Sequence, residues 1–360
     1  MPVETPIKFA ASAELMGDQV NSPPKTIFDK IPLGLVMLLA RPYLAGDDPQ
    51  AAIKQAHHIY AQDKFASTLD ILGEDSVTDE QCDAIVTEYQ RLIDAVRADL
   101  INCEKPRQQM TISMKPSMFS TVPPQPGKES ERALELAFDR ITRVVDYAMK
   151  NNISMTLEAE DHRWANFHLE AYFALINAGY TNLGTVLQTR LFRTEKDVAR
   201  FDERMRVRLV IGIYNEPAQL AHTDKRNMKE LVVTYAQQLL NKGTYVELAT
   251  HDAKCVEHFY RSVAVPHKIG PENFEHQFLL GVPRAKLQKG LISGQYFAEL
   301  ARTMPSEHGE QLERLQRRGA IVRMYLPYGT PRVSGAYCRR RLRENPNMIA
   351  YGIKNVFGIQ

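Results

Sequence analysis

The sequence predicts an α/β protein, a distorted (β/α)8 TIM-like barrel that follows an N-terminal helical segment. From residue 106 onward, short apolar stretches of strand length alternate with amphipathic stretches of helical spacing. This alternation is typical of a parallel sheet with helical crossovers. No G-x-G-x-x-G turn follows the first of these strands, which counts against an open dinucleotide-binding sheet. We therefore expect two regions, a helical arm at 1–105 and the barrel at 106–360.

The N-terminal region is predicted to be helical. Residues 49–72 have apolar side chains at helical spacing, and 78–101 form a long amphipathic pattern. The second helix begins at Thr78, whose hydroxyl suits an N-cap, with acidic residues in its first turn. Gly73 separates the two helices.

The barrel region shows seven clear strands, so one of the eight units is irregular. The predicted strands are 108–115, 153–160, 183–191, 207–214, 245–252, 274–281 and 320–329. The predicted helices are 131–152, 163–180, 194–206 (capped by Thr194), 228–243, 253–265 and 309–319, and a last helix begins near Tyr337. Regular alternation over this length fits a closed barrel better than an open sheet.

The composition is that of an ordinary globular protein, with 44% hydrophobic and 24% charged residues and a formal net charge of +2. So small a net charge gives no global attraction to nucleic acid or anionic lipid. No apolar run approaches the roughly 18 residues of a spanning helix, and no signal peptide is evident. The four cysteines are scattered, as reduced thiols are. We expect a cytoplasmic protein, whose contact with the inner membrane, if any, is peripheral.

Polar side chains stand at nearly every predicted strand end, where barrel enzymes carry their chemistry. Lys115 lies within an apolar strand, so its ammonium needs a carboxylate or an anionic ligand as partner. It could instead be the Schiff-base lysine of an aldolase, an alternative that the residues leave open. The strand-end residues are Lys115, Glu158, Glu160, Asp161, Gln188, Gly212, Tyr214, Thr250, His251, Asp252, Gln277, Leu279 and Tyr325.

Other site motifs are absent from the sequence. There is no Walker loop, no G-x-S-x-G and no histidine cluster at ligand spacing. These absences argue against nucleoside-triphosphate, hydrolase and metal-centre interpretations.

The stretch "YCRRRLREN" at 337–345 concentrates positive charge in a nearly neutral chain. On a helix, Tyr337, Arg340, Arg341 and Glu344 share one face. Two adjacent guanidiniums can hold a carboxylate through bidentate, charge-assisted bonds. A nucleic-acid site would need more basic residues and interleaved aromatics nearby. A small-anion site is therefore favoured over a solvated helix surface, and nucleic-acid binding is not expected.

Eight segments in order resemble the flavin-dependent proline dehydrogenases. "YCRRRLREN" resembles their Y-x-x-R-R-L-x-E-N signature, and "VRMYLPYG" precedes it at the family's spacing. The remaining segments are "FASTLDILGED", "TISMKPS", "TVLQTRLFRT", "VRLVIGIYNEPAQLAHTDK", "VELATHD" and "FEHQFLLG". The long segment "VRLVIGIYNEPAQLAHTDK", the fourth of the eight along the chain, is extended as in the monofunctional bacterial branch of the family.

The resemblance implies an FAD-binding barrel that oxidises L-proline to Δ1-pyrroline-5-carboxylate and passes electrons to a membrane quinone. It implies catalytic roles for Lys115, Glu158, Tyr325, Arg340 and Arg341. The implied proline contacts are Lys115, Tyr214, Leu279, Tyr325, Tyr337, Arg340 and Arg341. The implied FAD contacts are Gln188, Arg208, Gly212, Lys225, Thr250, His251 and Glu344. Glu74 would pair with an arginine of the cluster as a gate, and Tyr325 favours proline over hydroxyproline.

Three residues depart from the family pattern. Glu158 stands where the family has Asp, and Ile211 and Ile213 replace the Lys and Ala of its K-G-A-Y segment. They leave open a related flavin barrel that oxidises another cyclic or N-alkyl amino acid, such as hydroxyproline, or a non-enzymatic proline or flavin sensor. No DNA-binding or aldehyde-dehydrogenase module is seen, so we expect a separate pyrroline-5-carboxylate dehydrogenase.

Overall fold

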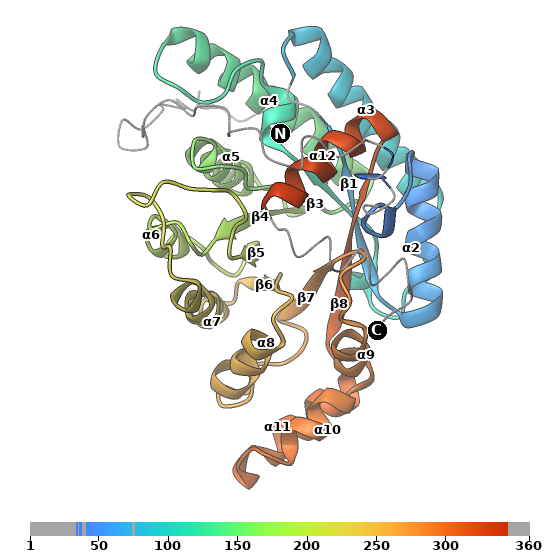
Figure 1. Ribbon diagram of the computed structural model, residues 1–360, viewed down its shortest axis with the longest axis vertical. Helices are drawn as coiled ribbons and strands as arrows, with labels where there is room; N and C mark the ends of the chain where they lie inside the picture. Colours follow the sequence, from blue (N-terminus) through green and yellow to red (C-terminus); the bar gives the residue numbers. More distant parts are fainter. Residues whose placement is uncertain (1–33, 35, 38–40, 74–75, 345–360) are drawn as a thin grey trace.

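The computed structural model describes residues 34, 36–37, 41–73 and 76–344, with the backbone alone at 336 and 339–344. Eight parallel strands close into one barrel in sequence order, β1 to β8, and the helices surround it (Figure 1). The predicted (β/α)8 barrel is therefore confirmed. The strands are β1 (Ala66–Ile71), β2 (Thr111–Met114), β3 (Met155–Leu157), β4 (Leu183–Gln188), β5 (Arg206–Val210), β6 (Tyr245–Leu248), β7 (Phe274–Leu279) and β8 (Ile321–Tyr328).

The helices lie on the outside, and α10 and α11 lie side by side at the lower end of Figure 1. Thr78 caps α3 as predicted, since its hydroxyl accepts from the Gln81 amide at 3.3 Å. The helices are α2 (Pro49–Asp63), α3 (Asp79–Ala98), α4 (Lys128–Lys150), α5 (Ala165–Asn177), α6 (Thr194–Val198), α7 (Lys225–Asn241), α8 (Ala253–Phe259), α9 (Ala285–Ser293), α10 (Gln295–Ala301), α11 (Gly309–Arg318) and α12 (Pro331–Glu344). A single π-helical segment, Tyr260–Ala264, follows α8.

The prediction of helix over 49–72 is wrong for its last third. The helix α2 ends at Asp63, where Lys64 adopts a left-handed φ of 59°, and residues 66–71 form β1. The strand is buried on both faces, so its short apolar run could not be distinguished from helix by spacing. The β1 register to β8 runs from Ala66↔Arg323 to Ile71↔Tyr328 and closes the barrel. The predicted boundary at residue 106 thus falls between the first two barrel strands.

Two other predictions on helices are wrong, and two helices were not predicted. Residues 199–206 are not helical, and the Thr194 hydroxyl donates to the Gln188 carbonyl at 2.6 Å instead of capping α6. The helices α9 and α10 were not expected, because the sequence between β7 and α11 lacks a long periodic stretch. The last helix begins at Pro331, before Tyr337, since proline fits the first helical turn.

The barrel interior is polar, whereas the apolar core lies between the strands and the outer helices. Cross-barrel contacts such as Arg208 of β5 with Gln277 of β7, 2.5 Å from Nε to Oε1, show that these side chains point inward. Burying charge is costly unless each charge has a partner. Four carboxylates and four cations meet this need: Asp70, Glu158, Glu247, Glu275, Lys115, Arg206, Arg208 and Arg323.

Candidate active site at the barrel mouth

The ends of β1, β2 and β8 bring a lysine, an aspartate and a tyrosine together. The Lys115 ammonium donates to both carboxylate oxygens of Asp70, at 2.6 and 2.8 Å. The Ser113 hydroxyl lies 3.0 Å from Asp70 Oδ1 and 3.1 Å from the Tyr325 hydroxyl, which links the pair to the tyrosine. Burial, then the Asp70 charge, raises the pKa of Tyr325 well above its ordinary value. Tyr325 is therefore a neutral phenol beside a fixed ammonium.

A buried arginine occupies the next sector of the mouth. Arg208 of β5 donates to Glu158 after β3 and, through Nε, to Gln277 of β7. Its guanidinium also lies 5.2 Å from the centroid of the Tyr325 ring, within cation–π range. Burial alone would lower the pKa of Arg208, but the carboxylates of Glu158 and Glu247 outweigh it and raise that pKa. Arg208 is thus a permanent cation inside the barrel.

Eleven buried side-chain polar atoms of the described residues have no hydrogen-bond partner, and Arg190 Nε and Glu216 Oε1 on the loops of this region are among them. Three others, Gln188 Oε1, Arg208 Nη2 and His251 Nδ1, belong to residues that the sequence singled out. The Gln188 amide nitrogen is already held by the Glu160 carbonyl at 2.7 Å, so its free oxygen has a fixed direction. Because unpaired buried polar groups are rare and costly, this set indicates where a polar ligand binds.

Gly212 lies against Gln188 at the end of β5. Its φ of +100° is a conformation that side chains disfavour, and a Cβ there would lie 2.6 Å from Gln188 Oε1. The same backbone stretch continues to Tyr214, whose carbonyl accepts from Arg190 Nη1 at 2.5 Å. Only glycine leaves this sector open.

The end of β6 supplies Thr250 and His251. Thr250 is buried, and its hydroxyl accepts from the Asp252 amide at 3.2 Å. Burial, then the nearby Arg284 charge, lowers the pKa of His251 to about 4. The imidazole is therefore neutral at physiological pH, with one nitrogen able to accept and one able to donate.

The helix α12 closes over an apolar cluster at the mouth. Tyr337 is buried with Tyr43 and Leu72, and Leu279 of β7 packs against them. The backbone of Arg340, Arg341 and Glu344 lies on this helix, whereas their side chains, and Glu74 altogether, lie outside the described part. Lys225 is exposed at the start of α7, and Tyr214 is half-buried.

The sequence did not single out Asp70 or the pair of His162 and Glu216. Asp70 is 1% exposed, and a carboxylate within an apolar run, "STLDI", was the signal that could have found it. His162 Nδ1 lies 2.6 Å from Glu216 Oε2, and both side chains are buried. The pair ties the loop after β3 to the loop after β5 that carries Tyr214. No local pattern predicts such a contact.

The part of the chain that the structure describes shows neither a metal centre nor a membrane-spanning helix. It contains no group of three or more potential metal-ligating side chains. Within the same residues, no helix combines the length and apolarity needed to cross a bilayer.

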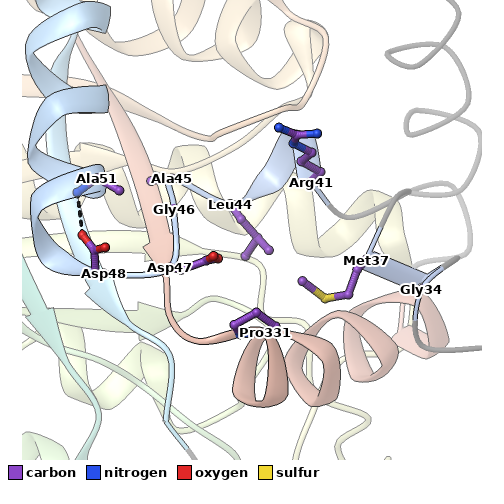
Figure 2. Close-up of a pocket in the computed structure, with 10 residues that line it drawn as sticks. All are labelled: Gly34, Met37, Arg41, Leu44, Ala45, Gly46, Asp47, Asp48, Ala51 and Pro331. Atoms are coloured by element: carbon purple, nitrogen blue, oxygen red, sulfur yellow. Dashed lines mark hydrogen bonds between the residues drawn. The ribbon is translucent and has the colours of Figure 1, made fainter.

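A separate pocket of about 750 Å³ lies beside the start of α2 and the start of α12 (Figure 2). Asp47 and Arg41 line it, and Asp48, which caps α2 through the Ala51 amide at 2.8 Å, does so too. None of its lining residues belongs to the strand-end set, so we do not assign the active site to it.

The model of the family described as proline dehydrogenase matches residues 52–349. The chain belongs to the proline dehydrogenase family. The resemblance predicted from the motifs is therefore confirmed. A proline dehydrogenase of Deinococcus radiodurans is 31% identical over 88% of this chain and 90% of its own length. Proline dehydrogenase 1 of Bacillus subtilis strain 168 is 25% identical over the same shares.

The fold is also that of solved structures of proline utilization A. The crystal structure of proline utilization A (PutA) from Bdellovibrio bacteriovorus, inactivated by N-propargylglycine, matches with a TM-score of 0.68 at 20% identity. The match covers 87% of this chain and 33% of that one, so the chain spans about a third of that protein. At this identity the likeness shows the fold alone.

Proposed function

We propose that this member of the proline dehydrogenase family oxidises L-proline to Δ1-pyrroline-5-carboxylate, with FAD as hydride acceptor and a quinone as the final electron acceptor. One observation carries the proposal. The buried atoms without partners, Gln188 Oε1, Arg208 Nη2 and His251 Nδ1, belong to residues that the family motifs assign to FAD. An isoalloxazine ring offers polar atoms along one edge and needs such fixed partners.

The space at Gly212 supports the same cofactor. A side chain there would fill the volume beside Gln188 Oε1, and the positive φ keeps it free of one. Gln188, Arg208, Gly212, Thr250 and His251 would hold FAD at the mouth, with Lys225 and Glu344 at its outer parts. When bound, FAD supplies the two-electron acceptor that no side chain can provide.

The chain's own residues would bind and orient proline. Arg340 and Arg341, on the helix face that also carries Tyr337, would hold the carboxylate in bidentate fashion. Lys115, fixed by Asp70, would add a third positive charge at that end of the site. Glu74 would close over the substrate by pairing with the arginines. The remaining ring contacts would come from Tyr214, Leu279, Tyr325 and Tyr337.

This arrangement suits hydride transfer from the carbon next to nitrogen. The carboxylate clamp and the aromatic wall would fix the ring in a reactive orientation and exclude water. The amine must be neutral when the hydride leaves, because its lone pair drives the departure. The cationic Arg208, held by Glu158, would stabilise negative charge that develops near the cofactor.

One alternative loses support from the geometry, and two departures from the family pattern are accommodated by it. A Schiff-base aldolase needs an uncharged lysine, whereas both oxygens of the Asp70 carboxylate bind the Lys115 ammonium. The departure at Glu158 leaves a productive contact, since the longer side chain reaches Arg208. Ile213 is 44% exposed, so nearly half of its surface faces solvent. Tyr325 favours proline over hydroxyproline, which remains the second candidate substrate.

The test is an anaerobic titration of the purified, flavin-loaded protein with L-proline, followed by the visible absorbance of oxidised flavin. We expect proline to bleach it and hydroxyproline or sarcosine to do so much less. Reoxidation by a soluble quinone then tests the acceptor. A flavin that stays oxidised with proline would refute the activity, and preferential bleaching by hydroxyproline would establish the alternative. The product would pass to a separate pyrroline-5-carboxylate dehydrogenase, and contact with membrane quinone would be peripheral.

A further inference from the structure

Gln277 lies on β7, and its side chain points into the barrel among charged residues. It is 4% exposed and has no place in the site that the family motifs describe. We propose that Gln277 is a positioning residue, which holds the Arg208 guanidinium so that Nη2 is left for the flavin. The inference rests on the proposed function, because Arg208 is assigned there to FAD.

Two carboxylates fix the orientation of the Gln277 amide. Its nitrogen donates to Glu247 Oε2 and to Glu275 Oε1, each at 2.7 Å. The reverse orientation would place the amide oxygen against both carboxylates, and its N–H groups against the N–H of Arg208. Only one orientation satisfies all of these groups, so the amide oxygen must accept from Arg208 Nε, at 2.5 Å.

The remaining donors of Arg208 then have defined partners. Nη1 donates to Glu158, and Nε to Gln277, which fixes the plane of the guanidinium. Nη2 is buried and has no partner among the described residues. Two of the three guanidinium nitrogens are thus hydrogen-bonded. The third, Nη2, is therefore oriented to donate to an acceptor before any ligand binds.

The two carboxylates are themselves held in place. Glu275 pairs with Arg323 at 2.6 Å, and Glu247 with Arg206. Neither carboxylate is therefore free to turn toward Arg208 in place of the amide. Glu247 Oε2 lies 3.6 Å from Arg208 Nε, a longer contact than the 2.5 Å bond from Nε to the Gln277 amide oxygen. The Nε donor is therefore directed to the amide oxygen, while Glu247 contributes its charge from the longer distance.

The experiment is a double-mutant cycle on FAD binding to the full-length apo-protein, read by flavin fluorescence. Gln277→Met should weaken FAD binding roughly tenfold, the value of one charged hydrogen bond. In an Arg208→Met background the same change should have an effect of less than about twofold, because the partner is gone. The flavin midpoint potential should be lower in Gln277→Met than in wild type. In the Arg208→Met background, adding Gln277→Met should leave the midpoint potential unchanged.

Gln311→Met is the matched control, since Gln311 of α11 is 6% exposed and donates to the Ala264 and Ile269 carbonyls, outside the barrel. It should change stability and leave FAD affinity and potential unchanged. Gln277→Asn, which keeps an amide but shortens its reach, serves if the methionine variant fails to fold. Equal effects of Gln277→Met in both backgrounds would overturn the inference alone. A wild-type protein that binds no FAD would overturn it together with the proposed function.

Discussion

Asp70→Asn gives the most direct test of the mouth of the barrel. The substitution keeps the shape of the side chain and the bond from Ser113 but removes the charge that faces Lys115. Asp70 is 1% exposed, and the Lys115 side chain is 16% exposed, so water reaches the ammonium only in part. The variant therefore leaves a largely buried cation opposite a neutral amide.

The expected loss follows from that burial. Breaking a buried ion pair by removing one partner costs about 3–5 kcal/mol. The partial access of water to Lys115 and the retained Ser113 bond favour the lower end, about 3 kcal/mol. An unfolding entropy of about 2.1 cal/mol/K per residue gives about 0.76 kcal/mol/K for a chain of 360 residues, so a loss of about 3 kcal/mol should lower the melting temperature by about 4 °C. The ratio kcat/KM for proline should also fall, because Lys115 loses the carboxylate that fixes its position.

Thermal and urea unfolding of wild type and variant measure this loss. Asp146→Asn is the control, since Asp146 forms a pair with Lys150 on the surface of α4 whose side chains are 32% and 70% exposed. Such a pair is worth at most about 0.5 kcal/mol. Equal losses in the two variants would refute the reasoning that the Asp70 pair is a buried, structure-determining contact.

Three further predictions follow from other parts of the site and core. Gly212→Ala should reduce FAD affinity more than roughly tenfold in a fluorescence titration, because strain at its positive φ adds to the clash with Gln188. Glu216→Ala leaves His162 buried and loosens the loop after β5, so KM for proline should rise roughly tenfold in steady-state assays. Burial lowers the pKa of His276 from 6.5 to about 3, so only the unfolded chain binds this proton between those values. The free energy of unfolding should therefore fall as pH drops through that window, and less steeply in His276→Gln.

Each of these three predictions has a control variant or a comparison whose result would support or contradict it. Gly309→Ala meets no atom within 4 Å and should leave FAD affinity intact, so an equal loss there would contradict the role of Gly212. Glu216→Gln keeps an acceptor for His162, so its KM for proline should be closer to that of wild type than to that of Glu216→Ala. If the free energy of unfolding falls equally steeply with decreasing pH in wild type and in His276→Gln, His276 does not cause the pH dependence.

Much of the architecture could be predicted because it follows from the spacing of apolar residues along the chain. The alternation of apolar runs and amphipathic stretches locates seven strands, and strand ends locate Lys115, Gln188 and His251. The missing strand, Ala66–Ile71, has no distinctive period because helices cover its outer face and polar residues its inner face. Such a segment resembles the end of the preceding helix until its pairing with β8 is known.

The sequence by itself thus determined the barrel, the family and the residue types at the mouth, since periodicity and motif spacing are properties of neighbours in the chain. The tertiary structure alone decided which of those residues meet. Asp70 and Lys115 are 45 positions apart, and Arg208 and Gln277 are 69 apart. Barrel closure brings them within hydrogen-bond distance, and their burial there makes each unpaired charge too costly to leave without a partner.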